Sequence, residues 1–245
     1  MTPTLVLILF ISFVASLVRS TLGFGESLIA VPLFLFFLPA NVAVPLSVML
    51  SIIIALVIVI QDHSKIHFNS AKWLILYAIL GIPLGVLVLI YGNETIVKIG
   101  LGSLIVAYAL YSLLGRSAYV LKEDSKLLLF ICGFLSGVLG GAYGLNGPAL
   151  VVYGNLRQWT AKHFRATLQA YFLPASLIGF IGYYIKGLIT PEVNHYFLMA
   201  LTTSIPAIFL GRYLNHKIKD RSFFKYAYWS LFIIGIILII NSLLK

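Results

Sequence analysis

Two glycine-rich stretches, GFGESLIAVPL at residues 23–33 and GGAYGLNGPALVVY at residues 140–153, decide how this chain folds. Each leads into an apolar piece, residues 27–38 and 148–154, that is too short to cross a bilayer as a helix. Irregular backbone survives at membrane depth only where it lines a cavity or is buried in protein. We therefore interpret both stretches as the breaks of re-entrant helical hairpins.

The composition around the breaks is that of an integral membrane protein. Of the 245 residues, 61% are hydrophobic and 10% are charged, and the mean hydropathy is +1.04, which is far from the values of soluble domains. Because nothing alternates like the strands of a barrel, we expect every apolar run to be a helix. The long runs cover residues 3–22, 43–60, 73–91, 99–114, 127–142, 166–185, 196–211 and 226–244.

The sequence does not support redox, metal or nucleic-acid chemistry. Cys132 is the single cysteine and lies in an apolar run, which is typical of packing. His63 and His67 have a spacing that suits a metal, but a solvated loop explains them better, so we expect no metal and no cofactor. The basic residues are scattered between apolar runs, which argues against nucleic acid. The first sixteen residues lack a positive n-region, so we expect them in the mature protein.

The chain repeats its own features. Three of them recur at a slowly drifting offset of 121 to 123 residues: Gly23 with Gly144, Gly25 with Gly147, and the Ile-Pro pairs at 82–83 and 205–206. We predict an all-α integral membrane protein with an inverted-topology repeat of about eight helical segments. The first repeat covers residues 1–120, with the hairpin 3–38 and helices 43–60, 73–91 and 99–114. The second covers residues 127–245, with the hairpin 127–154 and helices 166–185, 196–211 and 226–244.

Charge asymmetry gives the expected topology. With two hairpins, thirteen basic residues fall on one side of the membrane, in the loops 61–72, 115–126, 155–165 and 212–225, and three fall on the other: Lys98, Lys186 and Lys245. The positive-inside rule makes the first side cytoplasmic and places both termini outside. If the second broken segment crossed once instead, eight of the basic residues would move outside, so the charges favour the hairpin.

Interrupted helices of inverted repeats form the substrate sites of secondary transporters. A helix that begins inside the membrane leaves N–H groups unpaired, and these groups, with the positive end of the helix dipole, favour a small oxyanion. Glycines let such backbone approach a ligand. Gly23, Gly25, Gly144 and Gly147 are therefore candidate binding residues. The alternative is that these glycines only permit close helix packing.

Arg19 and Glu26 are the charged residues that lie deepest in apolar sequence, seven positions apart. Burying either one is costly unless it is paired. Two interpretations stay open: the residues pair with each other, or Arg19 binds the anion through its forked donors and Glu26 carries a coupled proton. The second interpretation rests on the fact that a carboxylate in a low-dielectric site can exchange a proton near neutral pH.

The second break carries no charged residue. Tyr143 and Asn146 are the candidate hydrogen-bond donors there. Further along the chain, Arg165 and Gln169 share one helix face. We expect Gln169 to face the pore, and Arg165 either to attract anions at the inner mouth or to anchor the topology. Ser47 is a weaker candidate, because a serine can hydrogen-bond to its own helix.

The two breaks, together with FRATLQAYFL at 164–173 and GIPLG at 81–85, resemble the sulfite exporter TauE/SafE family, also called TSUP, over nearly the whole chain. This resemblance implies a carrier of the bacterial inner membrane that moves sulfite, sulfonates such as sulfoacetate, or related sulfur anions, mostly outward. The family's glycine motifs correspond to Gly23, Gly25, Gly144 and Gly147. Asn146 stands where glycine is frequent in the family, a departure that bears on the substrate more than on the class.

We therefore expect a secondary transporter that moves a small sulfur-containing oxyanion by alternating access. The alternatives are an anion channel that uses the same site and a membrane-embedded enzyme. The sequence contains no HExxH or GxSG motif and no pair of intramembrane aspartates, which argues against the enzyme. The expected partners are the anionic substrate and the lipid bilayer. A homodimer is compatible with the sequence, which selects no interface for it.

Overall fold

The computed structural model describes residues 3–114, 121–157, 159 and 161–217, and a few positions between 229 and 243. In this part of the chain the regular elements are helices, which confirms the all-α prediction. Most of the predicted span 226–244 lies outside the described residues. The helices are α1 (Pro3–Leu22), α2 (Glu26–Phe34), α3 (Ala40–Asp62), the short 3₁₀ helix η1 (His63–Lys65), α4 (Phe68–Tyr91), α5 (Glu94–Leu114), α6 (Lys126–Tyr143), α7 (Gly147–Leu156), α8 (Ala161–Ile185) and α9 (Pro191–Lys217).

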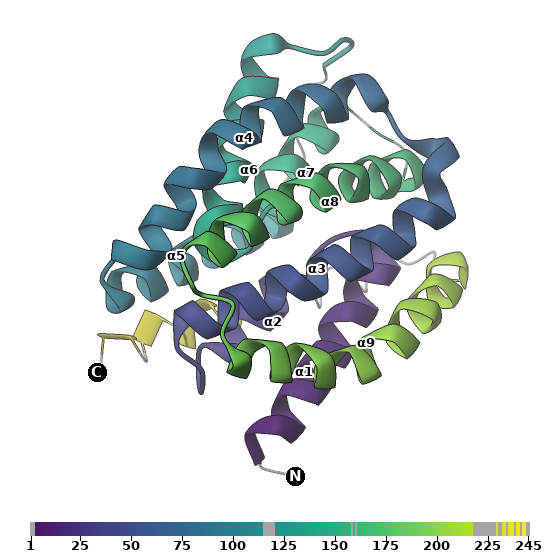
Figure 1. The fold of residues 1–245 in the computed structure, drawn as a ribbon. Coiled ribbons are helices and arrows are strands. Elements are labelled where there is room, and N and C mark those ends of the chain that lie inside the picture. The colour runs from purple at the N-terminus through teal and green to yellow at the C-terminus, as the bar shows by residue number, and fades with distance from the viewer. Residues whose placement is uncertain are drawn as a thin grey trace.

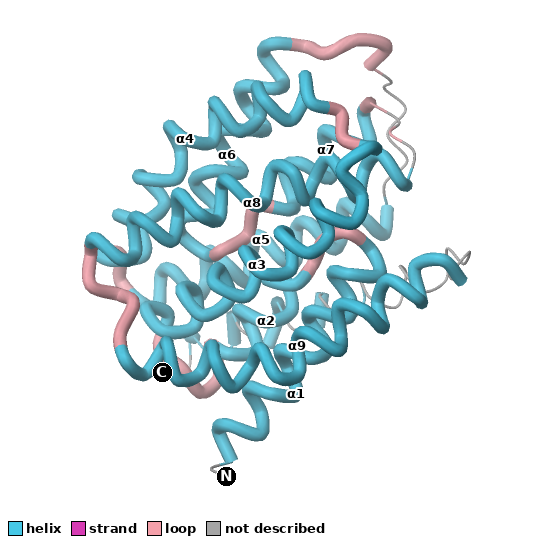
Figure 2. Tube along the Cα trace, turned by 45° about the vertical axis from the view of Figure 1, so that its right-hand side comes forward, coloured by secondary structure: helices cyan, strands magenta, loops and turns pink. Residues whose placement is uncertain are grey.

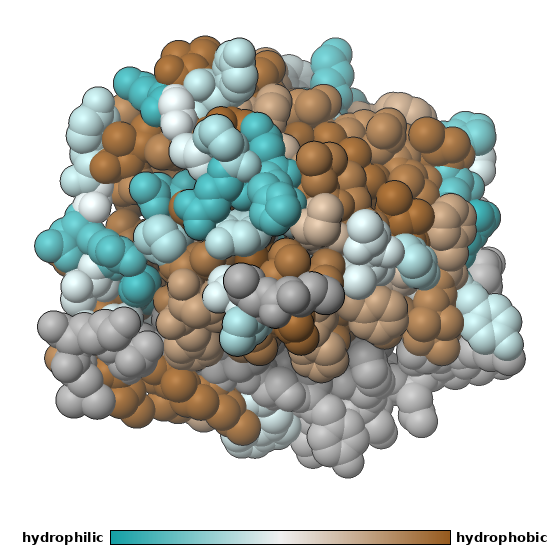
Figure 3. Space-filling view, turned by 60° about the horizontal axis from the view of Figure 1, so that its bottom comes forward, coloured by the Kyte–Doolittle hydropathy of each residue, from teal (hydrophilic) through white to brown (hydrophobic). Residues whose placement is uncertain are grey.

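Seven of the described helices, α1, α3, α4, α5, α6, α8 and α9, are long and apolar enough to cross a membrane. Large apolar side chains on them are exposed: Phe10 by 66%, Ile60 by 67% and Ile181 by 54%. Figure 3 shows hydrophobic residues over much of one face. Contiguous apolar surface of this extent needs a nonpolar environment. The chain is therefore a multi-pass membrane protein, as predicted.

Helices α4 and α6 pack backbone against backbone. Gly81 and Gly85 of α4 face α6, which carries a glycine at every fourth residue, at positions 133, 137 and 141. A methyl group added to Gly137 would lie 2.8 Å from the Cα of Ala78 and in contact with its carbonyl oxygen. The GIPLG sequence therefore provides a small-residue helix contact.

Replacing Gly137 with alanine is expected to lower the free energy of unfolding by about 1–3 kcal/mol, because α4 and α6 must separate to admit the methyl group. Thermal unfolding of the purified protein in detergent measures the change. The matched control is Gly179→Ala on α8, where the nearest atom to an added methyl is 4.0 Å away. If both variants unfold like the original protein, α4 and α6 do not pack this closely.

A second helix pair is formed by α1 and α9. The Thr203 hydroxyl of α9 donates a hydrogen bond to the Leu9 carbonyl of α1 at 3.0 Å, and Gly211 packs against Ser20. Between the two pairs, α3 packs against α8, as Figure 1 shows near the centre of the molecule. Helices five labels apart are therefore equivalent, α1 to α6, α3 to α8 and α4 to α9, so that the α4–α6 pair matches the α9–α1 pair.

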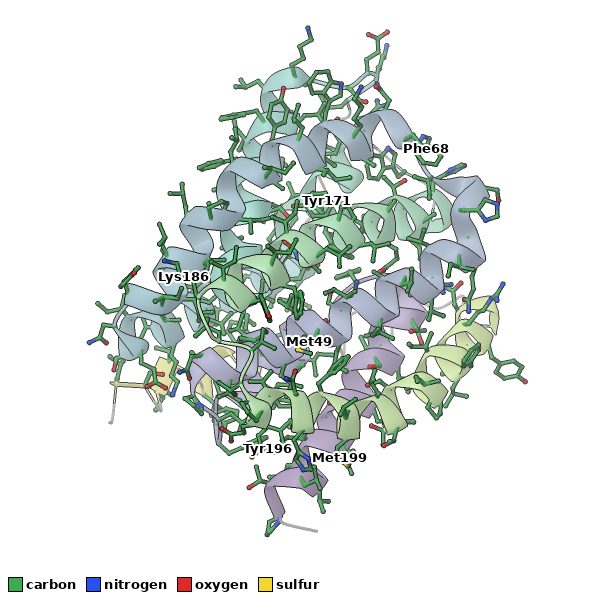
Figure 4. The ribbon with its side chains drawn as sticks, viewed as in Figure 1. Met49, Phe68, Tyr171, Lys186, Tyr196 and Met199 are labelled. Atoms are coloured by element: carbon green, nitrogen blue, oxygen red, sulfur yellow. The ribbon has the colours of Figure 1, made fainter. Side chains whose placement is uncertain are left out.

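The connections between helices lie at two opposite sides of the molecule. In Figure 1, the α3–α4 connection lies at the right and residues 121–125 before α6 lie at the top, whereas the α4–α5 and α8–α9 connections lie toward the left and the start of α1 lies at the bottom. Figure 2 shows the same separation after a turn of the view. Phe68, which begins α4, and Lys186, which follows α8, mark the two sides in Figure 4. The first side is the one that the basic loops predict to be cytoplasmic.

Candidate functional site

The first break lies between α1 and α2. Gly23 has φ +88° and Gly25 has φ +100°, values in the left-handed region that favours glycine. The Gly23 N–H donates to the Arg19 carbonyl at 2.7 Å and thereby ends α1. Helix α2 then begins at Glu26, and its N-cap residue Gly25 provides no side-chain cap. The first N–H groups of α2 are therefore available to water or a ligand.

The second break has the same construction at its first residue. Gly144 has φ +69°, and its N–H donates to the Gly140 carbonyl at 2.9 Å, as Gly23 does to Arg19. Gly23 and Gly144 thus occupy one position in two breaks, at the spacing of 121 residues that the sequence shows. Helix α7 begins three residues later, at Gly147. Both predicted breaks are present where the glycines place them.

The two breaks meet at a small cavity. Its volume is about 20 Å³, which is room for roughly one or two waters. Helices α3 and α8, on which Figure 4 labels Met49 and Tyr171, each contribute to the wall. The lining residues are Arg19, Gly25, Glu26, Ser27, Leu28, Ser51, Gly144, Leu145, Asn146, Gly147 and Phe172.

Arg19 is the centre of this site. Its side chain is 3% exposed, and Nη1 donates to Ser51 at 2.6 Å and to Glu26 at 3.2 Å. Nε and Nη2 donate to Oε1 of Gln169 at 3.2 and 2.9 Å, and Cζ lies 4.8 Å from the centre of the Phe172 ring. These bonds use four of the five guanidinium N–H groups. One N–H on Nη2 has no partner among the described residues.

Glu26 is equally buried and fully hydrogen-bonded. Its Oε1 accepts a bond from Ser47 at 2.7 Å, and its Oε2 accepts from Ser27 at 2.9 Å and from Arg19. Of the two interpretations that the sequence left open, mutual pairing of Arg19 and Glu26 is therefore observed. Both residues also line the cavity, so their roles toward an anion and a proton stay predictions.

Asn146 is the polar residue that the second break brings to the cavity. It is 6% exposed, and its Oδ1 has no hydrogen-bond partner among the described residues. The side-chain amide packs directly against the Cα of Gly140. A methyl group added to Gly140 would overlap Oδ1 of Asn146 and would lie 3.2 Å from Nδ2. The backbone carbonyl of Asn146 is held by the Ser136 hydroxyl at 2.6 Å. The backbone of Asn146 is therefore held in place, whereas its side-chain amide oxygen has no hydrogen-bond partner among the described residues.

Three predicted residues, Gly23, Tyr143 and Gln169, lie near the cavity without lining it. Gln169 is fully buried. Its Nε2 donates to the Gly23 carbonyl at 2.5 Å while its Oε1 accepts from Arg19, so it holds Arg19 against the first break. Tyr143 is half-buried, and its hydroxyl lies beside Gly100 of α5. Direct contact of these residues with an anion stays a prediction.

Arg165 lies one helical turn before Gln169 and is 5% exposed. Its Nη1 donates to Asn215 of α9 at 3.0 Å, and its Nε lies 3.7 Å from the Asp62 carboxylate at the end of α3. Asn215 also donates to the Thr21 carbonyl at 2.6 Å. Arg165 thus joins α8, α9 and α3 near the end of α1. Whether it also attracts anions stays a prediction.

The sequence analysis did not select several residues that the structure places in the site. Ser51 lies one turn after Ser47 on α3, and Phe172 lies three residues after Gln169 on α8. Helical spacing from the two selected residues would have found both. Ser27, Leu28 and Leu145 are neighbours of the break residues and carried no separate signal.

His67, which the sequence analysis assigned to a solvated loop, lies outside the membrane-spanning helices. Its ring stacks on Trp159 at 5.7 Å between centroids and lies 4.5 Å from His163. Desolvation lowers the pKa of His67, and His163 and Arg157 lower it further. His67 is therefore expected to be neutral at pH 7. Within the described ranges, no three His, Cys, Asp or Glu residues gather as they would around a metal.

The family model described as sulfite exporter TauE/SafE matches residues 8–238 of the chain. No curated protein and no solved structure gives a significant match. The matched range contains both breaks and all the residues that line the cavity.

Proposed function

The chain belongs to the sulfite exporter TauE/SafE family, and on this premise we propose that it is a secondary transporter that moves sulfite or an organosulfonate such as sulfoacetate outward. Membership in a transporter family favours transport of a sulfur anion over an enzymatic reaction. One observation carries the proposal: two helix breaks more than a hundred residues apart share a cavity with a buried arginine. Such breaks form the substrate sites of secondary transporters.

The proposed anion lies between the two breaks. Its oxygens accept hydrogen bonds from the N–H groups that begin α2 and α7, from the remaining Nη2 N–H of Arg19 and from Nδ2 of Asn146. Gly25, Gly144 and Gly147 keep this wall free of side chains. A methyl group added to Gly147 would meet no atom within 4 Å, which supports an open approach to the backbone there.

The proposed transport cycle is alternating access by two inverted repeats, residues 1–120 and 127–245, in the bacterial inner membrane with both termini outside. The matching helix pairs, α4 with α6 and α9 with α1, support this division. In the proposed topology, the bond between Arg165 and Asn215 lies on the cytoplasmic side of the cavity. It has to open when the site exchanges anions with the cytoplasm.

Counterflow in proteoliposomes tests the proposal. Vesicles preloaded with unlabelled sulfite are expected to take up labelled sulfite faster than empty vesicles, because a carrier returns more quickly when it is loaded on both sides. Protein-free vesicles are the control. An anion flux without acceleration would assign the protein as a channel, and the absence of any protein-dependent flux would reject the transport of this anion.

Proton coupling through Glu26 is the second part of the proposal. An anion bound beside the Arg19–Glu26 pair repels the Glu26 carboxylate and thereby favours its protonation. We expect Glu26→Gln to remove the pH dependence of methanesulfonate transport between about pH 5.5 and 8, a range in which this anion keeps a single charge. The control is His67→Gln, which removes a titratable group far from the cavity and should leave the profile in place. A pH profile that survives Glu26→Gln would limit Glu26 to a structural role.

A further inference from the structure

The residues around the cavity carry no net formal charge. Its two charged lining residues among those the structure describes are Arg19 and Glu26, which have opposite signs and lie 3.2 Å apart. The next charged groups along α8 and α3, Arg165 and Asp62, also have opposite signs and lie 3.7 Å apart. Among the described residues that line the cavity, no formal charge is therefore left over to balance a ligand.

The positive potential that remains comes from uncharged groups. Helices α2 and α7 are nine and ten residues long, and the residues at the beginning of each line the cavity. A helix N-terminus acts as about half a positive charge, so the two together supply roughly one unit. The buried Asn146 amide, whose Oδ1 has no partner among the described residues, adds a dipole but no charge.

We propose that the cavity selects oxyanions with a single negative charge over oxyanions with two. The inference rests on the proposed function and names the charge class of the substrate at that same site. One negative charge is balanced by the two helix ends. A second charge would stay uncompensated in a cavity from which most water is excluded, where electrostatic interactions are much stronger than in bulk water. Hydrogensulfite and sulfonates without a second acidic group belong to the selected class. Sulfate belongs to the rejected one, and so does sulfoacetate, whose carboxylate is ionised beside its sulfonate at neutral pH. The inference therefore narrows the proposed substrates to hydrogensulfite and singly charged sulfonates.

The charge of Glu26 sets this preference. While Glu26 is ionised, its carboxylate cancels Arg19, so replacing it with the isosteric, neutral glutamine leaves the cavity with one additional positive charge. The glutamine carbonyl oxygen can take the place of Oε2, which accepts from Ser27 and Arg19, and its NH2 group can donate to the Ser47 hydroxyl, which then donates to Ser27. The substitution therefore changes the charge of the site while keeping its shape.

Calorimetric titration of the purified full-length protein in detergent at one fixed pH tests the inference. The probes are methanesulfonate and sulfate, and perchlorate controls for the methyl group, because it is tetrahedral like sulfate and carries one charge. We expect methanesulfonate to bind the unaltered protein at least about tenfold more tightly than sulfate. Glu26→Gln is expected to reduce this ratio by about tenfold. Ser47→Ala, which removes a hydrogen bond of Glu26 but no charge, is expected to preserve it.

The outcomes separate the inference from the proposed function. If sulfate binds the unaltered protein as tightly as methanesulfonate, or if Glu26→Gln leaves the ratio unchanged, charge selection is wrong while anion binding at the site stands. If sulfite, methanesulfonate and sulfate all fail to bind, the proposed function itself is wrong. The comparison on the unaltered protein decides the inference even when Glu26→Gln does not fold.

Discussion

Replacing Arg19 and Glu26 together with glutamine is expected to weaken sulfite binding by about tenfold to hundredfold while the protein still folds. The expected loss comes from the ligand's hydrogen bond to Nη2 of Arg19, since hydrogen bonds to charged groups contribute about 1.5–3 kcal/mol. Calorimetric titration with sulfite measures the affinity. Thermal unfolding of the same sample in detergent verifies the fold.

The two substitutions belong together because the residues form a buried ion pair. Arg19→Gln alone would leave the Glu26 carboxylate without its cation at 1% exposure, and breaking a buried pair from one side costs about 3–5 kcal/mol. A loss of binding in that variant would then reflect unfolding as much as a lost contact. The double variant removes both charges and keeps neutral groups of similar size.

Ser51→Ala is the matched control for the double variant. It removes the 2.6 Å hydrogen bond to Nη1 of Arg19 but leaves the charge and the Nη2 N–H in place. We expect only a few-fold loss of affinity from this neutral contact. Unchanged sulfite affinity in the Arg19→Gln/Glu26→Gln variant would show that Arg19 does not contact the anion.

The sequence predicted the breaks well because glycine reports directly on backbone conformation. Gly23 and Gly144 end their helices with positive φ, which side chains other than glycine disfavour. The two positions recur at a fixed spacing in the sequence, so the breaks and their equivalence could be found without coordinates. The charged pair was also identifiable, because Arg19 and Glu26 interrupt apolar runs.

The partners of the pair could not be predicted in the same way. Ser51 lies 32 positions from Arg19 and Gln169 lies 150 positions from it, and local patterns carry no information about such contacts. Although the spacing of Ser47 and Ser51 on α3 puts them on one helix face, the sequence does not indicate which groups that face meets. Gln169 was expected to face the pore, but its hydrogen bonds to Arg19 depend on how α8 lies relative to α1.

The second break shows a difference between the halves that the sequence alone did not explain. Gly140 lies four residues before Gly144, as Arg19 lies four residues before Gly23. The first half therefore has a long cationic side chain at this position, and the second half has none. The side-chain amide of Asn146 fills the space over Gly140. It can lie there because glycine has no side chain.

Replacing Gly140 with alanine is accordingly expected to lower sulfite affinity by about tenfold or more without loss of stability. The added methyl group would overlap Oδ1 of Asn146, so the amide must rotate and carry Nδ2 away from its place at the cavity. The backbone itself tolerates alanine, because Gly140 lies within α6 and alanine favours helix over glycine by about 1 kcal/mol. Titration with sulfite and thermal unfolding measure the two effects separately.

A double-mutant cycle shows whether Gly140 acts through Asn146. Asn146→Ala removes the amide and is expected to lower the affinity by a similar factor. Adding Gly140→Ala to that variant should then cost nothing further, because the methyl group has no amide to displace, and the coupling between the two substitutions should equal the whole effect of Gly140→Ala. Two losses that simply add would place the effect of Gly140 in the packing of α6, and Asn146 would no longer be the group that Gly140 positions.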